Sequence, residues 1–277
     1  MFLCWVFLVL LLPATLMMSG AANSAQLDLF VLAGQSNMQG WKSNASDYPQ
    51  DDTGLDSGIK FYWQAPGISS SGGRWVDLQP QAGLFANGHF GPEVTFAREL
   101  KKAGYSPAIF KFSLGGTSLG VDWGYRGDNG LYDQMTLELK DAIAQLRERG
   151  NEVVPRALVW VQGESDANRR LAREYQLRLK NLIDDMRLNV LGDAQLPIIL
   201  GVDEQHPDVR LFPEVVLAQQ SLATSGPNIV YTSMWGLEKS DATHLTAIGA
   251  QGHGVRLFVA YIDLISFNTN KLGSAYK

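Results

Sequence analysis

FVLAGQSNMQGW, residues 30–41, begins as a continuous apolar run and ends in small and amide-bearing polar residues. The segment 27–33 is apolar enough to form a strand buried on both faces, as in a parallel sheet. Gly34 permits a sharp exit from that strand, because glycine adopts backbone conformations that other residues rarely reach. Ser36 and its polar neighbours then lie on a turn at the strand's carboxyl end, outside the core.

The rest of the chain repeats this alternation of short apolar runs with longer helical patterns. Strands that alternate with helices predict an α/β fold around a mainly parallel sheet, which gathers its ligands at the carboxyl ends of the strands. The segment 41–90, rich in Gly, Ser and Asp, indicates a long irregular insertion. The other predicted strands are 107–113, 156–161, 197–202 and 228–232, and the predicted helices are 92–103, 131–149, 167–188, 212–224 and 246–264.

An apolar run without charged side chains, residues 2–18, precedes the small residues 19–25. This pattern predicts that residues 1–25 are a secretory signal peptide, cleaved after Ala22 or Ala25, and that the protein is secreted or periplasmic. An uncleaved membrane anchor is the alternative. Residues 26–277 are then expected to form one domain, which is long enough to bury a substantial core.

Composition excludes several classes of function. The only cysteine is Cys4, so the chain after the predicted cleavage has no thiol for catalysis, disulfides or zinc. The formal net charge is −5 and there is no run of like charges, which argues against nucleic acid and anionic membranes as partners. We expect no metal and no other cofactor, and the sequence leaves the oligomeric state open.

Polar clusters follow three of the predicted strands, and a fourth precedes the last predicted helix. All four fall where the parallel-sheet rule places ligands, so we expect them to converge at one edge of the sheet. The clusters are 34–37 (GQSN), 114–119 (LGGTSL), 162–166 (QGESD) and 241–244 (DATH).

These residue types suit ester hydrolysis, which needs a nucleophile, a base and donors for the developing oxyanion. Ser36 is the candidate nucleophile and His244 the candidate base. Asp241 is the preferred acid to orient the imidazole, with Glu164 as the alternative. The candidate oxyanion donors are the N–H of Ser36, the N–H of Gly115 or Gly116, and the side-chain amide of Gln162.

Gln35 and Asn37 are expected to fix the turn by hydrogen bonds and, with Trp41, to contact the substrate. Plainer interpretations exist for the same residues. A serine at this position is often only a helix cap, and a Gly-Gly pair is often only a turn. Structural or surface roles are expected for the other histidines, His89, His206 and His253.

The blocks 34–38 (GQSNM), 115–118 (GGTS), 160–166 (WVQGESD) and 241–244 (DATH) occur in the order of the blocks of the SGNH hydrolases. More narrowly, the chain resembles carbohydrate esterase family six and the related sialate O-acetylesterase-type domain. The resemblance implies a three-layer α/β/α, flavodoxin-like fold and metal-free deacetylation of acetylated sugars. It aligns Ser36 with the nucleophile, His244 with the base and Asp241 with its orienting acid.

The sequence departs from the family pattern beside the third strand. Val161 stands where the family often has His, and Gln162 stands where the broader superfamily usually has Asn. We expect an exported serine esterase that removes acetyl groups from acetylated xylan or a similar polysaccharide through an acyl-enzyme. A sialate O-acetylesterase, a catalytically inactive glycan-binding domain and a lipase-like esterase remain alternatives.

Overall fold

The computed structural model describes Met1 and residues 24–275, with the side chains of 268–275 excepted. The predicted apolar segment 2–18 and the predicted cut after Ala22 lie outside the described residues. Among the residues that the structure describes, no helix is both long and apolar enough to cross a lipid bilayer.

A single mainly parallel sheet organises the chain, in the strand order β3-β2-β5-β1-β6-β7-β8, with β4 paired to β2. Only β3 and β4 run antiparallel to their neighbour. The first strand lies in the middle, between β5 and β6, so the carboxyl ends of these three strands adjoin. The strands are β1 (Gln26–Gly34), β2 (Lys60–Ala65), β3 (Ser69–Ser70), β4 (Val76–Asp77), β5 (Pro107–Ser113), β6 (Glu152–Val161), β7 (Ile198–Val202) and β8 (Ile229–Ser233).

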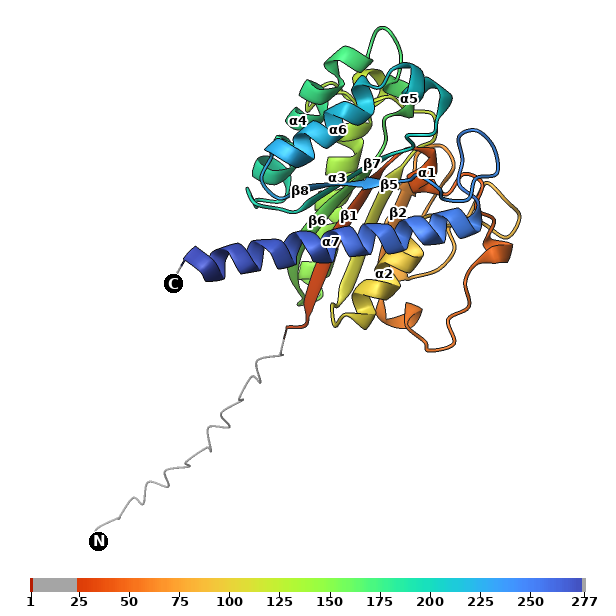
Figure 1. Ribbon diagram of the computed structural model, residues 1–277. Helices are drawn as coiled ribbons and strands as arrows, with labels where there is room; N and C mark the ends of the chain where they lie inside the picture. Colours follow the sequence, from red (N-terminus) through yellow and green to blue (C-terminus); the bar gives the residue numbers. More distant parts are fainter. Residues whose placement is uncertain (2–23, 276–277) are drawn as a thin grey trace.

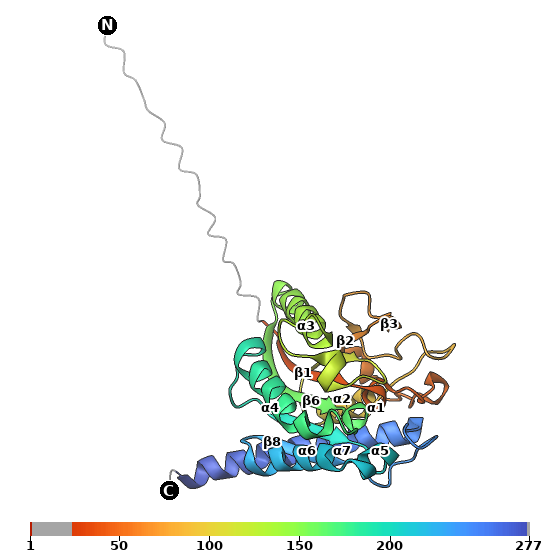
Figure 2. The same cartoon turned by 90° about the horizontal axis from the view of Figure 1, so that it is seen from above.

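Helices cover both faces of the sheet (Figure 1). One apolar cluster packs α2 and α7 against the sheet, and the other packs α3, α4 and α6 against the opposite face. Figure 2 shows α3 and α7 on opposite sides of the strands. The helices are α1 (Ser36–Gln39), α2 (Glu93–Lys102), α3 (Leu131–Glu148), α4 (Tyr175–Asp185), α5 (Pro207–Leu211), α6 (Glu214–Ser225) and α7 (Ala247–Ala275).

The alternation of side chains along β1 explains this three-layer arrangement. Leu29, Val31 and Ala33 join the cluster under α3, whereas Phe30 and Leu32 join the cluster under α7. All five are fully buried. A strand with apolar side chains on both faces is stable only with a layer on each side, so the predicted α/β/α fold is confirmed.

The prediction of an irregular segment over 41–90 is wrong at β2. Phe61, Tyr62 and Trp63 are almost fully buried, and the strand pairs in parallel with β5. These aromatic residues are good strand formers, but Gly58 and the Pro66-Gly67 turn on either side hide a strand of only six residues.

The helix predicted over 167–188 begins later, at Tyr175. The Asn168 side chain accepts hydrogen bonds from the backbone N–H groups of Arg170 and Leu171. An asparagine that binds nearby N–H groups favours a turn over a helix, so residues 164–174 form short 3₁₀ turns and a loop beside the carboxyl end of β6.

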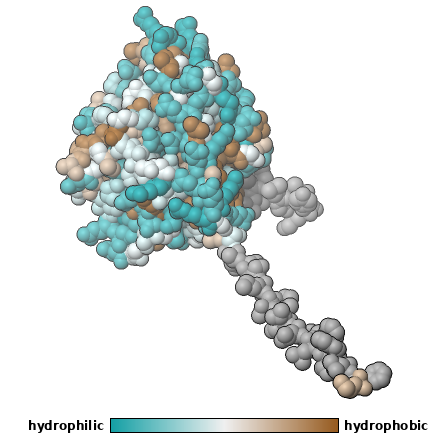
Figure 3. All heavy atoms as spheres, turned by 180° about the vertical axis from the view of Figure 1, so that it is seen from behind, coloured by the Kyte–Doolittle hydropathy of each residue, from teal (hydrophilic) through white to brown (hydrophobic). Residues whose placement is uncertain are grey.

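On the face opposite to that of Figure 1, apolar residues are scattered among hydrophilic ones (Figure 3). Scattered apolar side chains are normal on a protein surface.

Candidate active site

The predicted site residues follow the carboxyl ends of the strands, as expected for a parallel sheet. Ser36 follows β1, Gly115 and Gly116 follow β5, and Gln162 and Glu164 follow β6. The turn with Asp241 and His244 lies between β8 and α7. The contacts described below join these loops at one edge of the sheet.

Gly34 makes the sharp turn before Ser36 possible. Its φ is +146°, and a Cβ there would lie 1.9 Å from the carbonyl oxygen of Val161. No other residue fits so close to the neighbouring strand. The Gln35 N–H then donates to the same Val161 oxygen at 3.0 Å, and α1 begins at Ser36. Ser36 is only 3% exposed.

Asn37 joins the serine turn to the histidine turn, although the two are more than 200 residues apart in sequence. Its Nδ2 donates to the Thr243 carbonyl oxygen at 3.0 Å, and its Oδ1 accepts from the Leu245 N–H at 3.0 Å. These two bonds, which we call the Asn37 clamp, bracket His244 on both sides. The residue after Ser36 therefore fixes the backbone that carries the predicted base.

His244 contacts Asp241 through one ring nitrogen. Its Nδ1 lies 2.9 Å from Asp241 Oδ2 and 3.1 Å from Oδ1, while the backbone N–H groups of Thr243 and His244 donate to Oδ1 at 2.8 Å. Burial raises the pKa of Asp241, but these hydrogen bonds outweigh it and hold the pKa at about 2. The carboxylate is therefore charged at neutral pH and leaves the His244 Nε2 available.

Gly115 lies directly against the predicted nucleophile, since a Cβ on it would be 3.4 Å from the Ser36 Cβ and 3.1 Å from the Trp41 ring. The Gly115 N–H is already engaged, because it donates to Gln39 Oε1 at 2.8 Å. Gly116 has a φ of +73° and is exposed, and within residues 24–275 its N–H has no partner.

Trp41 is half-buried and lies beside the histidine, with 6.3 Å between the two ring centroids. The other tryptophans considered for the cleft, Trp63, Trp75 and Trp123, are buried in the two apolar clusters. Of these four tryptophans, Trp41 is therefore the one that borders the predicted site.

The oxyanion role predicted for Gln162 does not fit this arrangement. The side chain is fully buried, and its Nε2 donates to the Thr117 carbonyl oxygen at 3.1 Å and to Asp166 Oδ2 at 2.6 Å. Its Oε1 accepts from the Tyr175 hydroxyl at 3.1 Å. Both amide hydrogens are thus committed to the loops after β5 and β6.

The substrate contacts predicted for Gln35 and Asn37 also do not fit. Both residues are 2% exposed. The Gln35 Oε1 accepts from the Gly163 N–H at 3.3 Å, and Asn37 forms the clamp on the histidine turn. Their amides hold neighbouring loops in place, which is the other role that the sequence suggested.

Glu164 does not contact His244. Its Oε1 accepts from the Asp203 N–H at 3.1 Å and from Asn37 Nδ2 at 3.5 Å, and its Oε2 is buried without a partner. Burial raises the pKa of Glu164 to about 7. Of the two acids considered for orienting the imidazole, only Asp241 lies within hydrogen-bond distance of it.

A buried ion pair below the serine turn was not predicted. Lys111 Nζ lies 2.6 Å from Glu93 Oε2, both side chains are fully buried, and Nζ also donates to the Gln39 carbonyl oxygen at 3.2 Å. Glu93 Oε1 accepts from the Gly91 N–H at 2.9 Å. A lysine inside an otherwise apolar strand was the available signal, because a buried lysine needs a partner.

Two of the remaining histidines are buried and have structural surroundings. His253 in α7 is fully buried with neither ring nitrogen bonded, and burial lowers its pKa to about 3. Burial first, and then the charge of Lys111, lower the pKa of His89 to about 4. Among the described residues, no group of three His, Cys, Asp or Glu side chains is placed to hold a metal ion.

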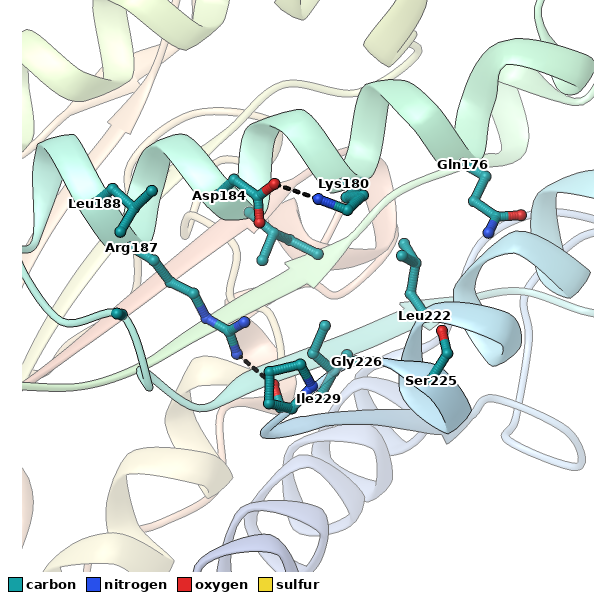
Figure 4. A pocket seen from close by; sticks show the side chains of 12 residues that line it. Gln176, Lys180, Asp184, Arg187, Leu188, Leu222, Ser225, Gly226 and Ile229 are labelled. Carbon is teal, nitrogen blue, oxygen red and sulfur yellow. Dashed lines mark hydrogen bonds and ion pairs between the residues drawn. The ribbon is translucent and has the colours of Figure 1, made fainter.

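A hollow lies between α4 and α6, at the amino end of β8 (Figure 4). Its polar side chains are already paired: Lys180 bonds Asp184, and Arg187 donates to the Pro227 carbonyl oxygen at 2.8 Å. The amino ends of parallel strands lie at the opposite edge from the carboxyl ends. This hollow is therefore separate from the loops around Ser36.

The family model of the carbohydrate esterases described as sialic acid-specific acetylesterase matches residues 26–263. The chain belongs to this carbohydrate esterase family. It is accordingly a carbohydrate acetylesterase, with the SGNH-type fold expected from the four sequence blocks. Comparison with curated proteins finds no matching sequence.

Solved structures agree with the family's fold. A protein from Arabidopsis thaliana is 25% identical with a TM-score of 0.61, over 85% of this chain and 98% of its own. NanS is 15% identical with a TM-score of 0.65, over 88% and 98% of the two chains. A carbohydrate acetylesterase from Xanthomonas citri is 19% identical with a TM-score of 0.53, over 84% and 55%.

Proposed function

We propose that this esterase removes O-acetyl groups from a polysaccharide such as acetylated xylan, through an acyl-enzyme on Ser36, after export from the cell. The observation that carries the proposal is the Asn37 clamp. It brings a histidine already oriented by an ionised aspartate to the residue next to Ser36. A nucleophile, a base and an orienting acid on separate loops form the arrangement of a serine hydrolase.

In the proposed reaction, Ser36 Oγ attacks the acetyl carbonyl while His244 Nε2 takes its proton. Asp241 stabilises the imidazolium that forms. The N–H groups of Ser36 and Gly116 donate to the oxyanion, in place of the Gln162 amide. His244 then protonates the departing sugar oxygen and later activates water to release acetate.

The family description favours a second candidate substrate, O-acetylated sialic acid. The chemistry at the acetyl carbonyl is the same for both substrates, so the difference must lie in contacts around the sugar. Trp41, which lies beside His244, is an aromatic side chain available for such contacts.

Acetate release from acetylated xylan, O-acetylated sialic acid and a chromogenic aryl acetate tests the proposal. We expect turnover of xylan above that of sialic acid, and a loss of about ten-thousandfold or more for Ser36→Ala on every substrate. Ser225→Ala, an exposed serine on α6, is the matched control and should retain full activity. Equal rates for Ser36→Ala and the wild type would exclude the serine mechanism.

A further inference from the structure

Two separate anchors hold the turn that carries Asp241 and His244. The first is the Asn37 clamp on residues 243 and 245. The second is Lys239, which pairs with Asp203 and donates to the Ala242 carbonyl oxygen at 2.7 Å. Both anchors therefore hold the backbone of residues 242–245, which carries His244.

Both anchors meet at one buried side chain. Glu164 Oε1 accepts from Asn37 Nδ2, which belongs to the first anchor, and from the backbone N–H of Asp203, which belongs to the second. Glu164 is 4% exposed and lies on the 3₁₀ turn that follows β6. A single acceptor oxygen thus links the loops after β1 and β7 to the histidine turn.

From this connection we infer that Glu164 is a positioning residue, which fixes His244 against Ser36 through Asn37 and Asp203 without contacting the imidazole. The inference rests on the proposed function. In this role Glu164 acts as a hydrogen-bond acceptor through its oxygen, and its negative charge is not required. Asp241 supplies the charge that contacts His244.

The surroundings of Glu164 support an uncharged carboxyl. The neighbouring charged group is the Asp203 carboxylate, which pairs with Lys239, and the titratable hydroxyls of Tyr175 and Tyr231 also face Glu164. Hydrogen bonds from the backbone N–H groups of Glu164 and Asp203 lower the pKa of Glu164, but no ion pair among the described residues includes Glu164, and Oε2 has no hydrogen-bond partner. Burial then raises the pKa of Glu164 to about 7, so the group holds its proton below neutral pH.

The test compares Glu164→Gln with Glu164→Leu, using initial rates on the chromogenic acetate and thermal melting to confirm folding. Glutamine keeps an acceptor oxygen and removes the charge, so kcat should stay within about threefold of the wild type. Leucine removes the oxygen, so kcat should fall about 10- to 100-fold with KM nearly unchanged, as expected for a misplaced base. Asn37→Ala should show the same loss.

The double variant Glu164→Leu/Asn37→Ala should lose less than the product of the two single losses, because Glu164 acts in part through Asn37. A loss equal to or larger than that product would contradict the connection. Wild-type kcat in Glu164→Leu, or in Asn37→Ala, would overturn the inference. A loss in Glu164→Gln as large as that of Asp241→Asn would also overturn it, since the charge would then be required. If Glu164→Leu does not fold, Glu164→Gln and Asn37→Ala decide alone. Activity in Ser36→Ala would instead refute the proposed function.

Discussion

The serine turn and the histidine turn meet at the same edge of the sheet, but they are held in different ways. Ser36 is 3% exposed and lies two residues after Gly34, which is in close contact with the Val161 carbonyl group. The side chains of His244 and Asp241 are 21% and 40% exposed, and side-chain hydrogen bonds hold their turn. Substitutions beneath Ser36 should therefore act mainly on folding, and substitutions around His244 mainly on turnover.

The largest effect on turnover is expected from a substitution in the histidine turn. Asp241→Asn keeps an oxygen for the Thr243 and His244 N–H groups but presents an amide to the imidazole, which favours the wrong tautomer. We expect kcat to fall about ten-thousandfold with a nearly unchanged melting temperature. Asp184→Asn, on the exposed face of α4, is the matched control. Wild-type turnover in Asp241→Asn would remove Asp241 from the mechanism.

Substitutions beneath the serine turn should instead lower stability more than turnover. Lys111→Met leaves Glu93 buried without its cation, and removing one partner of a buried ion pair costs about 3–5 kcal/mol. We expect a strongly lowered free energy of unfolding in urea. The double variant Lys111→Met/Glu93→Leu should recover part of this loss. A single variant as stable as the wild type would show that the pair does not support the turn.

The smallest expected effect is on stability and comes from His253, which is buried in α7, unlike the partly exposed His244. His253 has a pKa of about 3 in the fold, against an ordinary value of 6.5. Below pH 6.5, His253 is therefore protonated in the unfolded chain but stays neutral in the folded protein. The free energy of unfolding falls as the pH drops. From pH 6.5 to 5 the loss is about 2 kcal/mol. In His253→Met this loss should be absent.

His89 changes stability in the same direction, because its pKa is also lowered by burial, to about 4. Glu164 has the opposite effect on the pH dependence of stability. Its pKa is raised from 4.5 to about 7, so its contribution to stability is complete below pH 4.5 and is lost as the pH rises through 7. The comparison of wild type with His253→Met at each pH isolates one group. Parallel stability curves for the two proteins would contradict the account of His253.

The sequence predicted the strands well because apolar runs report burial directly. The strand predicted over 107–113 coincides with β5, and that over 27–33 lies within β1. The strand β2 was not predicted because turn residues flank it on both sides. The helix α7 extends well beyond the predicted end at 264.

The site was only partly predictable, for a different physical reason. The contact between Asp241 and His244 is local, because the two residues are only three positions apart, and the sequence therefore suggested it. The partners of Asn37 lie 206 and 208 residues away, and those of the Gln162 amide include Thr117. Which loop an amide bonds depends on how distant segments pack, and no short pattern records that.

Covalent labelling with an organophosphorus fluoridate, followed by peptide mass mapping, tests the central claim most directly. The account predicts one adduct per chain, on the peptide that contains Ser36, and labelling slowed at least a hundredfold in His244→Ala. An adduct on a different serine, or equally fast labelling of Ser36 without His244, would contradict it.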